Sequence, residues 1–199
     1  GTGKTRLART NTPVAVSKVP SVRLQDTMLT LDNGVTAIRL PGGKRQFAKP
    51  LVMVGEQGAA IKNLEHLADA GLAFGPVAGI RLTDGHWTGG SYFAAELIEA
   101  VRFRQQSRAT EPDAATLRAA LEKAPKVTGY ETHVTEQGSL FVEATIRFAF
   151  DNGGYYQMTV QAIAGDPALR IDEVMDLKTN CPGGDPLYVA LLLNDGWKP

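Results

Sequence analysis

The stretch that decides the fold is residues 140–164, LFVEATIRFAFDNGGYYQMTVQAIA, in which apolar and polar side chains alternate on both sides of a glycine turn. Before the turn, the even-numbered positions are apolar, with Glu143, Thr145 and Arg147 between them. After the turn, the even-numbered positions from 156 to 162 are apolar again. Successive side chains of a strand point to opposite faces, so this period of two predicts two strands that each bury one face. Residues 151–154, DNGG, predict a tight turn between them.

The same alternation continues toward the C-terminal end of the chain. Residues 165–167, GDP, form another turn signal, a third strand is predicted at residues 169–177, and a fourth at residues 188–193. These strands form an antiparallel meander, because a parallel connection needs a crossover of about a dozen residues or more. Since each strand is apolar on one face only, a second layer must cover it, which predicts a sandwich of two sheets.

The N-terminal half predicts further strands and two helical stretches. Residues 22–40 read as a hairpin with Asn-Gly at its turn, and residues 80–93 as two short strands around Asp-Gly. Residues 59–70 carry apolar side chains at helical spacing, and residues 94–124 include Pro-Asp before an alanine-rich run, a helix start. The fold class expected is therefore mainly β: an antiparallel β-sandwich or supersandwich with one or two short helical insertions.

A chain of 199 residues suits one large β domain. Residues 1–20 are polar and without periodicity, and we expect a tail or edge segment there. Residues 21–199 are expected to form a single β-sandwich domain with a helical insertion at about residues 94–124. Residues 194–198, NDGWK, show no sign of a natural terminus, so we expect the chain to be a fragment of a longer protein.

The composition argues against several classes of function. The 21 basic side chains balance 21 acidic ones, and nucleic-acid binding, which requires clustered Lys and Arg, is not expected. No apolar run approaches the roughly 18 residues of a membrane-spanning helix. Residues 1–5, GTGKT, resemble the end of a phosphate-binding loop but lack the preceding strand. Cys181 is the only cysteine, which excludes an internal disulfide and a cysteine-based zinc site but leaves its own role open. We expect no metal and no cofactor.

Three residues are candidates for acid and base catalysis. Glu173 shares the strand phase of Leu169 and Ile171 and is therefore expected on the apolar face, where burial raises the pKa of a carboxyl group. Glycoside hydrolysis uses such a carboxyl group with a second one nearby. Alternatively, Glu173 lies at a strand end, at a bulge or beside an arginine such as Arg147 or Arg170. His86 and His133 are the other two candidates.

Asp84, His86, Trp87 and Tyr92 are the candidates for ligand binding. The first three lie together in a predicted turn, where an indole could stack on a sugar ring and the polar pair could bond its hydroxyl groups. The alternative is that Trp87, Tyr92 and Phe93 belong to the hydrophobic core.

Two segments carry a resemblance to a known family: residues 134–160, VTEQGSLFVEATIRFAFDNGGYYQMTV, and residues 164–173, AGDPALRIDE. They resemble the β-sandwich modules of large bacterial carbohydrate-active enzymes, including the supersandwiches similar to galactose mutarotase. The resemblance covers about residues 127–177, with support from residues 29–34, LTLDNG, and 87–93, WTGGSYF. Such modules accompany glycoside hydrolase and polysaccharide lyase catalytic domains, which implies a secreted or periplasmic protein. No catalytic motif of these families is matched.

The resemblance implies a non-catalytic or accessory domain of a secreted carbohydrate-active enzyme. Its expected partner is a carbohydrate or an adjacent catalytic domain, which it binds or positions. Two alternatives remain open. One is a complete sugar-acting enzyme of hydrolase, lyase or mutarotase type, with Glu173 and His86 or His133 as acid and base. The other is a structural or assembly protein of sandwich fold.

Overall fold

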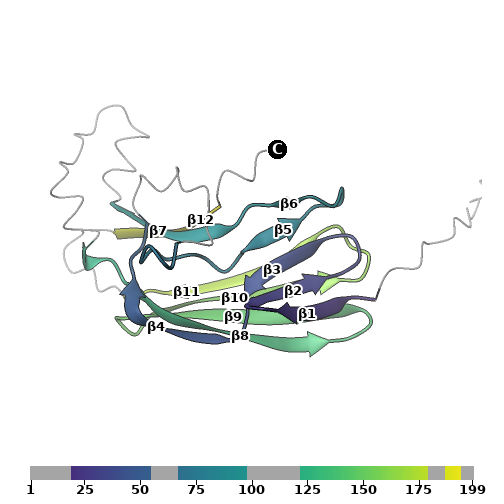
Figure 1. Cartoon of the computed structure of the whole chain (residues 1–199), viewed down its shortest axis with the longest axis horizontal. Helices are drawn as coiled ribbons and strands as arrows, with labels where there is room; N and C mark the ends of the chain where they lie inside the picture. The colour runs from purple at the N-terminus through teal and green to yellow at the C-terminus, as the bar shows by residue number, and fades with distance from the viewer. Residues whose placement is uncertain (1–18, 55–66, 98–121, 179–186, 194–199) are drawn as a thin grey trace, which may run out of the picture.

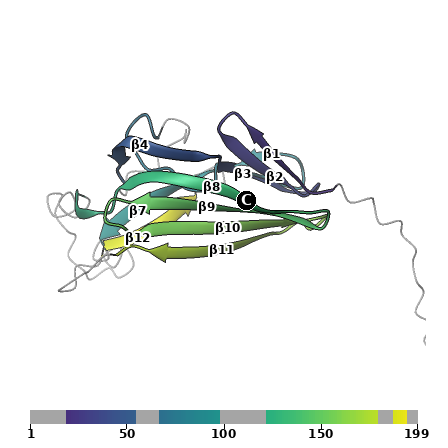
Figure 2. The same cartoon turned by 90° about the horizontal axis from the view of Figure 1, so that it is seen from below.

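The computed structural model describes residues 19–54, 67–97, 122–178 and 187–193. Several predictions lie outside these residues: most of the N-terminal tail, most of the helical stretch at residues 59–70, the greater part of the expected insertion, and Cys181. Within the described residues the chain is mainly β and folds into layered antiparallel sheets, as the alternation predicts (Figures 1 and 2).

One layer is the meander predicted from the C-terminal third, and we call it the meander sheet. Its strand order is β11-β10-β9-β8-β4, with every neighbouring pair antiparallel. The strands are β4 (Lys44–Leu51), β8 (Val127–Gln137), β9 (Phe141–Phe150), β10 (Tyr155–Ile163) and β11 (Leu169–Asp176). The pairing of β9 with β10 runs without a shift from Tyr155 opposite Ala149 to Ile163 opposite Phe141. The short DNGG turn sets this register, with Gly153 in the left-handed region at φ 81°.

The period of two in β9 and β10 matches the burial of their side chains. The even-numbered residues of both strands point into the sandwich and are buried, whereas their odd-numbered neighbours face outward and are half-buried or exposed. The buried set is Val142, Ala144, Ile146, Phe148, Phe150, Tyr156, Met158, Val160 and Ala162. These two central strands therefore supply one wall of the core.

The second layer, which we call the hairpin sheet, has the order β1-β2-β3-β5-β6. Its strands are β1 (Ser21–Gln25), β2 (Met28–Asp32), β3 (Ala37–Pro41), β5 (Gly79–Arg81) and β6 (Trp87–Thr88). The hairpin predicted at residues 22–40 is in fact three strands. The chain turns first between β1 and β2, where Asp26 takes a left-handed conformation at φ 54° that Asp tolerates better than most residues.

Asn33 explains why the Asn-Gly turn differs from the two-residue turn expected. Its side-chain Oδ1 accepts hydrogen bonds from the backbone N–H groups of Val35 and Thr36, at 3.0 and 2.8 Å, so residues 33–36 form one longer loop. Its Nδ2 donates to the carbonyl oxygen of Asp166 at 2.7 Å, and its own carbonyl accepts from Gly165 at 3.1 Å. A fully buried polar side chain thereby ties the β2–β3 loop to the β10–β11 turn.

A third pair of strands, β7 (Ser91–Leu97) and β12 (Leu187–Leu193), runs antiparallel beside the hairpin sheet (Figure 1). The prediction that residues 188–193 form the fourth strand of the meander is therefore wrong, because β12 pairs with β7 and not with β11. Residues 94–97 were expected to begin the helical insertion and instead end β7. Their sequence, AAEL, favours helix, but pairing with β12 overrides that local propensity.

The hairpin sheet and the β7–β12 pair together cover the inner face of the meander sheet. Phe93 of β7 is fully buried, and its ring centre lies 5.1 Å from that of Phe148, 5.2 Å from Tyr156 and 5.9 Å from Phe150. All three contacts are edge-to-face, an arrangement that aromatic quadrupoles favour. Across the described residues, no helix has the length and apolar character that crossing a membrane requires.

Candidate functional site

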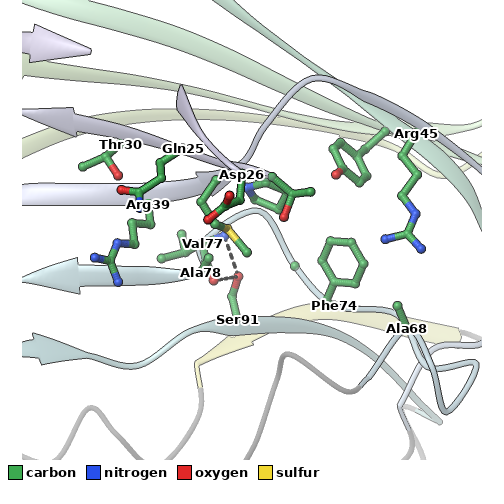
Figure 3. A pocket seen from close by; sticks show the side chains of 15 residues that line it. Gln25, Asp26, Thr30, Arg39, Arg45, Ala68, Phe74, Val77, Ala78 and Ser91 are labelled. Carbon is green, nitrogen blue, oxygen red and sulfur yellow. Dashed lines mark hydrogen bonds between the residues drawn. The ribbon is translucent and has the colours of Figure 1, made fainter. Parts of the chain in front are cut away.

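A cleft of about 550 Å³ lies where the end of the hairpin sheet meets β4, β8 and the segment before β5 (Figure 3). This volume is within the range of roughly 300–1,000 Å³ that is usual for small-ligand sites. Its lining combines polar side chains with two aromatic rings. The described residues that line it are Gln25, Asp26, Thr27, Met28, Thr30, Arg39, Pro41, Arg45, Ala68, Phe74, Gly75, Val77, Ala78, Ser91 and Tyr130.

Strand register places the polar residues Gln25, Thr30 and Arg39 on one face of the hairpin sheet. Thr30 lies directly opposite Arg39, and Gln25 lies opposite Met28, which is two residues from Thr30 on β2. The alternate positions Leu29 and Leu40 are buried in the core. Because neighbouring residues of a strand face opposite ways, burying those leucines turns the polar side chains toward the cleft.

Two arginines stand at opposite sides of the cleft (Figure 3), and each guanidinium lies over an aromatic ring. The Cζ atom of Arg39 is 3.8 Å from the ring centre of Trp87, and that of Arg45 is 5.3 Å from the ring of Phe47. Within the described residues, neither arginine forms an ion pair with a carboxylate. Stacking occupies the face of a guanidinium and leaves its in-plane N–H donors available to a ligand.

Phe74 and Tyr130 form the apolar side of the cleft. Their ring centres lie 5.8 Å apart in an edge-to-face contact, and the Tyr130 hydroxyl is 3.5 Å from the carbonyl oxygen of Gly42. Burial raises the pKa of Tyr130, against the opposing charge of Arg45, so the hydroxyl group remains protonated at neutral pH. Ser91 is held rigidly, since its hydroxyl accepts from Val77 N–H at 2.8 Å and donates to the Val77 carbonyl at 3.1 Å.

Asp84 and His86, two of the predicted ligand-binding residues, do meet in the β5–β6 turn. Nδ1 of His86 lies 3.1 Å from Oδ2 of Asp84, and the His86 backbone N–H donates to Oδ1 at 3.0 Å. The backbone hydrogen bond from His86, and then its ring, hold the pKa of the Asp84 carboxyl below its ordinary value. Both side chains are well exposed, and the turn is not part of the cleft lining.

Trp87 and Tyr92, the other two predicted ligand-binding residues, are engaged elsewhere. Trp87 is 37% exposed, but the guanidinium of Arg39 already covers one face of its ring. Tyr92 is only 5% exposed and packs with Val54, Leu67 and Ala94, so the core interpretation fits it.

Glu173 lies on the face of β11 that its strand phase predicts, directly opposite the buried Met158 of β10. The expected burial is nevertheless wrong: Glu173 is exposed, because β11 is the edge strand of the meander sheet among the described residues. The carboxylate accepts a hydrogen bond from the hydroxyl group of Tyr156, and its partner is neither Arg147 nor Arg170. Burial, and then this carboxylate, raise the pKa of Tyr156, so Tyr156 is the donor.

His133 lies on the outer face of the meander sheet. Its Nε2 is 3.0 Å from Oε1 of Glu131, whose other oxygen is 3.1 Å from Nζ of Lys44. Since Glu173 faces inward and His133 outward, they cannot act on one substrate atom together, and His86 belongs to the other sheet. Among the described residues, no group of three or more His, Cys, Asp or Glu side chains is arranged to hold a metal ion.

The cleft is not predictable from local sequence, because its lining comes from separate segments along the chain. One local signal was present: Gln25, Thr30 and Arg39 are the polar positions of the hairpin, at alternate places to its leucines. Nothing local indicates that Arg45, Phe74 and Tyr130 face them.

Comparison of the chain with protein-family models, with curated proteins and with solved structures gave no significant match. The site is therefore interpreted from its own geometry.

Proposed function

We propose that this chain is a non-catalytic, accessory β-sandwich domain of a secreted carbohydrate-active enzyme, and that it binds a glycan in the cleft. The observation that carries the proposal is the lining of the cleft, which combines hydrogen-bonding side chains with the aromatic rings of Phe74 and Tyr130. The resemblance of residues 127–177 to modules of such enzymes supports the same function.

A sugar ring presents hydroxyl groups around its edge and C–H groups on its faces. Gln25 and Thr30 can donate to and accept from those hydroxyl groups, Asp26 can accept from them, and Phe74 and Tyr130 offer apolar contact. Small-ligand sites typically combine an apolar lining with a few placed polar groups, and this cleft has both.

A binding role also fits the distribution of the candidate catalytic residues better than an enzymatic one. Acid and base catalysis requires both groups within reach of the same bond. Glu173, His86 and His133 lie on different faces or in different sheets, and none of them lines the cleft.

The proposal is tested by calorimetric titration of the chain with a panel of oligosaccharides, followed by the double variant Gln25→Ala/Thr30→Ala. Loss of two hydrogen-bonding side chains is expected to weaken binding about tenfold or more. The matched control is Gln137→Ala, which removes an exposed glutamine of β8 outside the cleft lining and should leave affinity unchanged. If no oligosaccharide binds, or if the control weakens binding as much as the double variant, the proposed function is wrong.

A further inference from the structure

The charges of the cleft indicate what kind of glycan it takes. Among the described residues that line it, Arg39 and Arg45 are basic and Asp26 is the one acidic residue. Within the described residues, neither guanidinium forms an ion pair with a carboxylate. With a neutral ligand, these two positive charges would face the one negative charge of Asp26, which leaves an excess of positive charge in the described lining.

The environment of Arg39 prepares its guanidinium for an anionic group. The Trp87 ring holds it from one face at 3.8 Å. A guanidinium fixed in orientation loses less entropy when it forms two parallel hydrogen bonds, and carboxylates and related oxyanions match that fork.

We propose that the cleft selects acidic glycans, whose carboxylate or sulfate ester groups bind Arg39 and Arg45, over neutral glycans of the same length. This inference rests on the proposed function, since it concerns the ligand of the same cleft. Asp26 opposes the anionic group through its like charge and thereby sets an upper limit on the preference.

The test uses the whole chain and three oligosaccharides of equal length: an oligogalacturonate, a sulfated oligogalactan and a neutral oligogalactan. We expect the better acidic ligand to bind about tenfold more tightly than the neutral one at low salt, and to lose that advantage as sodium chloride is raised. The two acidic ligands distinguish carboxylate from sulfate ester as the recognised group.

Three variants connect the preference to the cleft. Arg39→Gln should weaken acidic-glycan binding about tenfold and neutral-glycan binding less, because only the acidic glycan loses a charge-assisted contact. Asp26→Asn should strengthen acidic-glycan binding, because it removes the like charge of the carboxylate. Asparagine also tolerates the left-handed conformation at this position, so the turn is kept. The matched control is Arg147→Gln, which removes an arginine that stacks on Tyr155 at 3.9 Å outside the cleft lining. Circular dichroism and thermal unfolding check that each variant is folded.

Different outcomes separate this inference from the proposed function. Equal binding of neutral and acidic glycans, or equal effects of Arg39→Gln and Arg147→Gln, overturns the acidic preference while glycan binding stands. Equally tight binding of polyglutamate, a polyanion without sugar, also overturns it. If none of the three glycans binds, the acidic preference is overturned; if no oligosaccharide of the panel binds either, the proposed function is overturned as well.

Discussion

Replacing Asn33 by alanine removes the buried side chain that joins the two layers of the sandwich. In the native protein, Oδ1 of Asn33 accepts hydrogen bonds from Val35 and Thr36, and Nδ2 donates to the carbonyl group of Asp166. Alanine can make none of these bonds. The variant therefore leaves the Thr36 N–H, at a residue only 4% exposed, without its side-chain acceptor, and weakens the link to the β10–β11 turn.

The expected magnitude follows from which groups water can reach. An unpaired buried donor or acceptor costs about 1–3 kcal/mol. Val35 and Asp166 are partly buried, so water offsets part of the loss there, whereas Thr36 is buried. We expect the variant to lose about 3 kcal/mol of unfolding free energy, which for a domain of this size lowers the Tm by about 6–12 °C.

Urea unfolding followed by circular dichroism measures this loss, with an unchanged m value showing that the same surface is exposed on unfolding. The matched control is Asn152→Ala. Asn152 is itself exposed, and its side chain makes a part-buried bond to Gly154 and an exposed bond to Leu177, so its loss should cost less, about 1 kcal/mol. If Asn33→Ala costs no more than Asn152→Ala, the reasoning about the buried connection is refuted.

Three further predictions concern the core, an exposed ion pair and the edge strand. Phe93→Ala should cost about 3–5 kcal/mol in urea unfolding, because a fully buried ring with three aromatic contacts leaves a cavity; a loss under about 1 kcal/mol would contradict this packing. The hydrogen bond and charge of Lys44, and then His133, hold the pKa of the Glu131 carboxyl below 4.5. The ion pair therefore stabilises the fold above pH 4.5, and this contribution is lost as the pH falls through the lowered pKa. Lys44→Gln should raise the pKa of Glu131 in an NMR titration, and an unchanged pKa would rule out the ion pair. Glu173→Gln keeps an acceptor for the Tyr156 hydroxyl, so we expect the unfolding free energy to change by less than about 1 kcal/mol. Glycan affinity, measured by calorimetry, should stay the same, and a loss of binding would show that Glu173 belongs to the glycan-binding site.

The parts of the fold that local sequence determines were predicted correctly. In β9 and β10 every second residue is apolar and the turn between them is short, so neither the strands nor their register depends on distant residues. The longer β2–β3 loop was not predictable in this way, because Asn33 adopts it while bonding to Asp166, far along the chain. The pairing of β12 with β7 is likewise a choice between distant strands.

The candidate site shows the same division between local and distant determinants. The Asp84 and His86 contact was predictable, since a turn brings neighbours together. The exposure of Glu173 was not, because the alternation of β11 determines which face a residue occupies and not whether another strand follows. The cleft forms where several segments distant in sequence come together, and the polar positions of the hairpin are its one local sequence signal.

The central claim is that a glycan binds in the cleft formed by the end of the hairpin sheet, β4 and β8. The most direct test is a ¹H–¹⁵N NMR titration of the chain with the tightest-binding oligosaccharide. We predict saturable shifts of the backbone amides of Gln25, Thr30, Arg39 and Arg45, with the β5–β6 turn around His86 unaffected. Shifts confined to that turn or to the outer face of the meander sheet, or no saturable shifts at all, would contradict the claim.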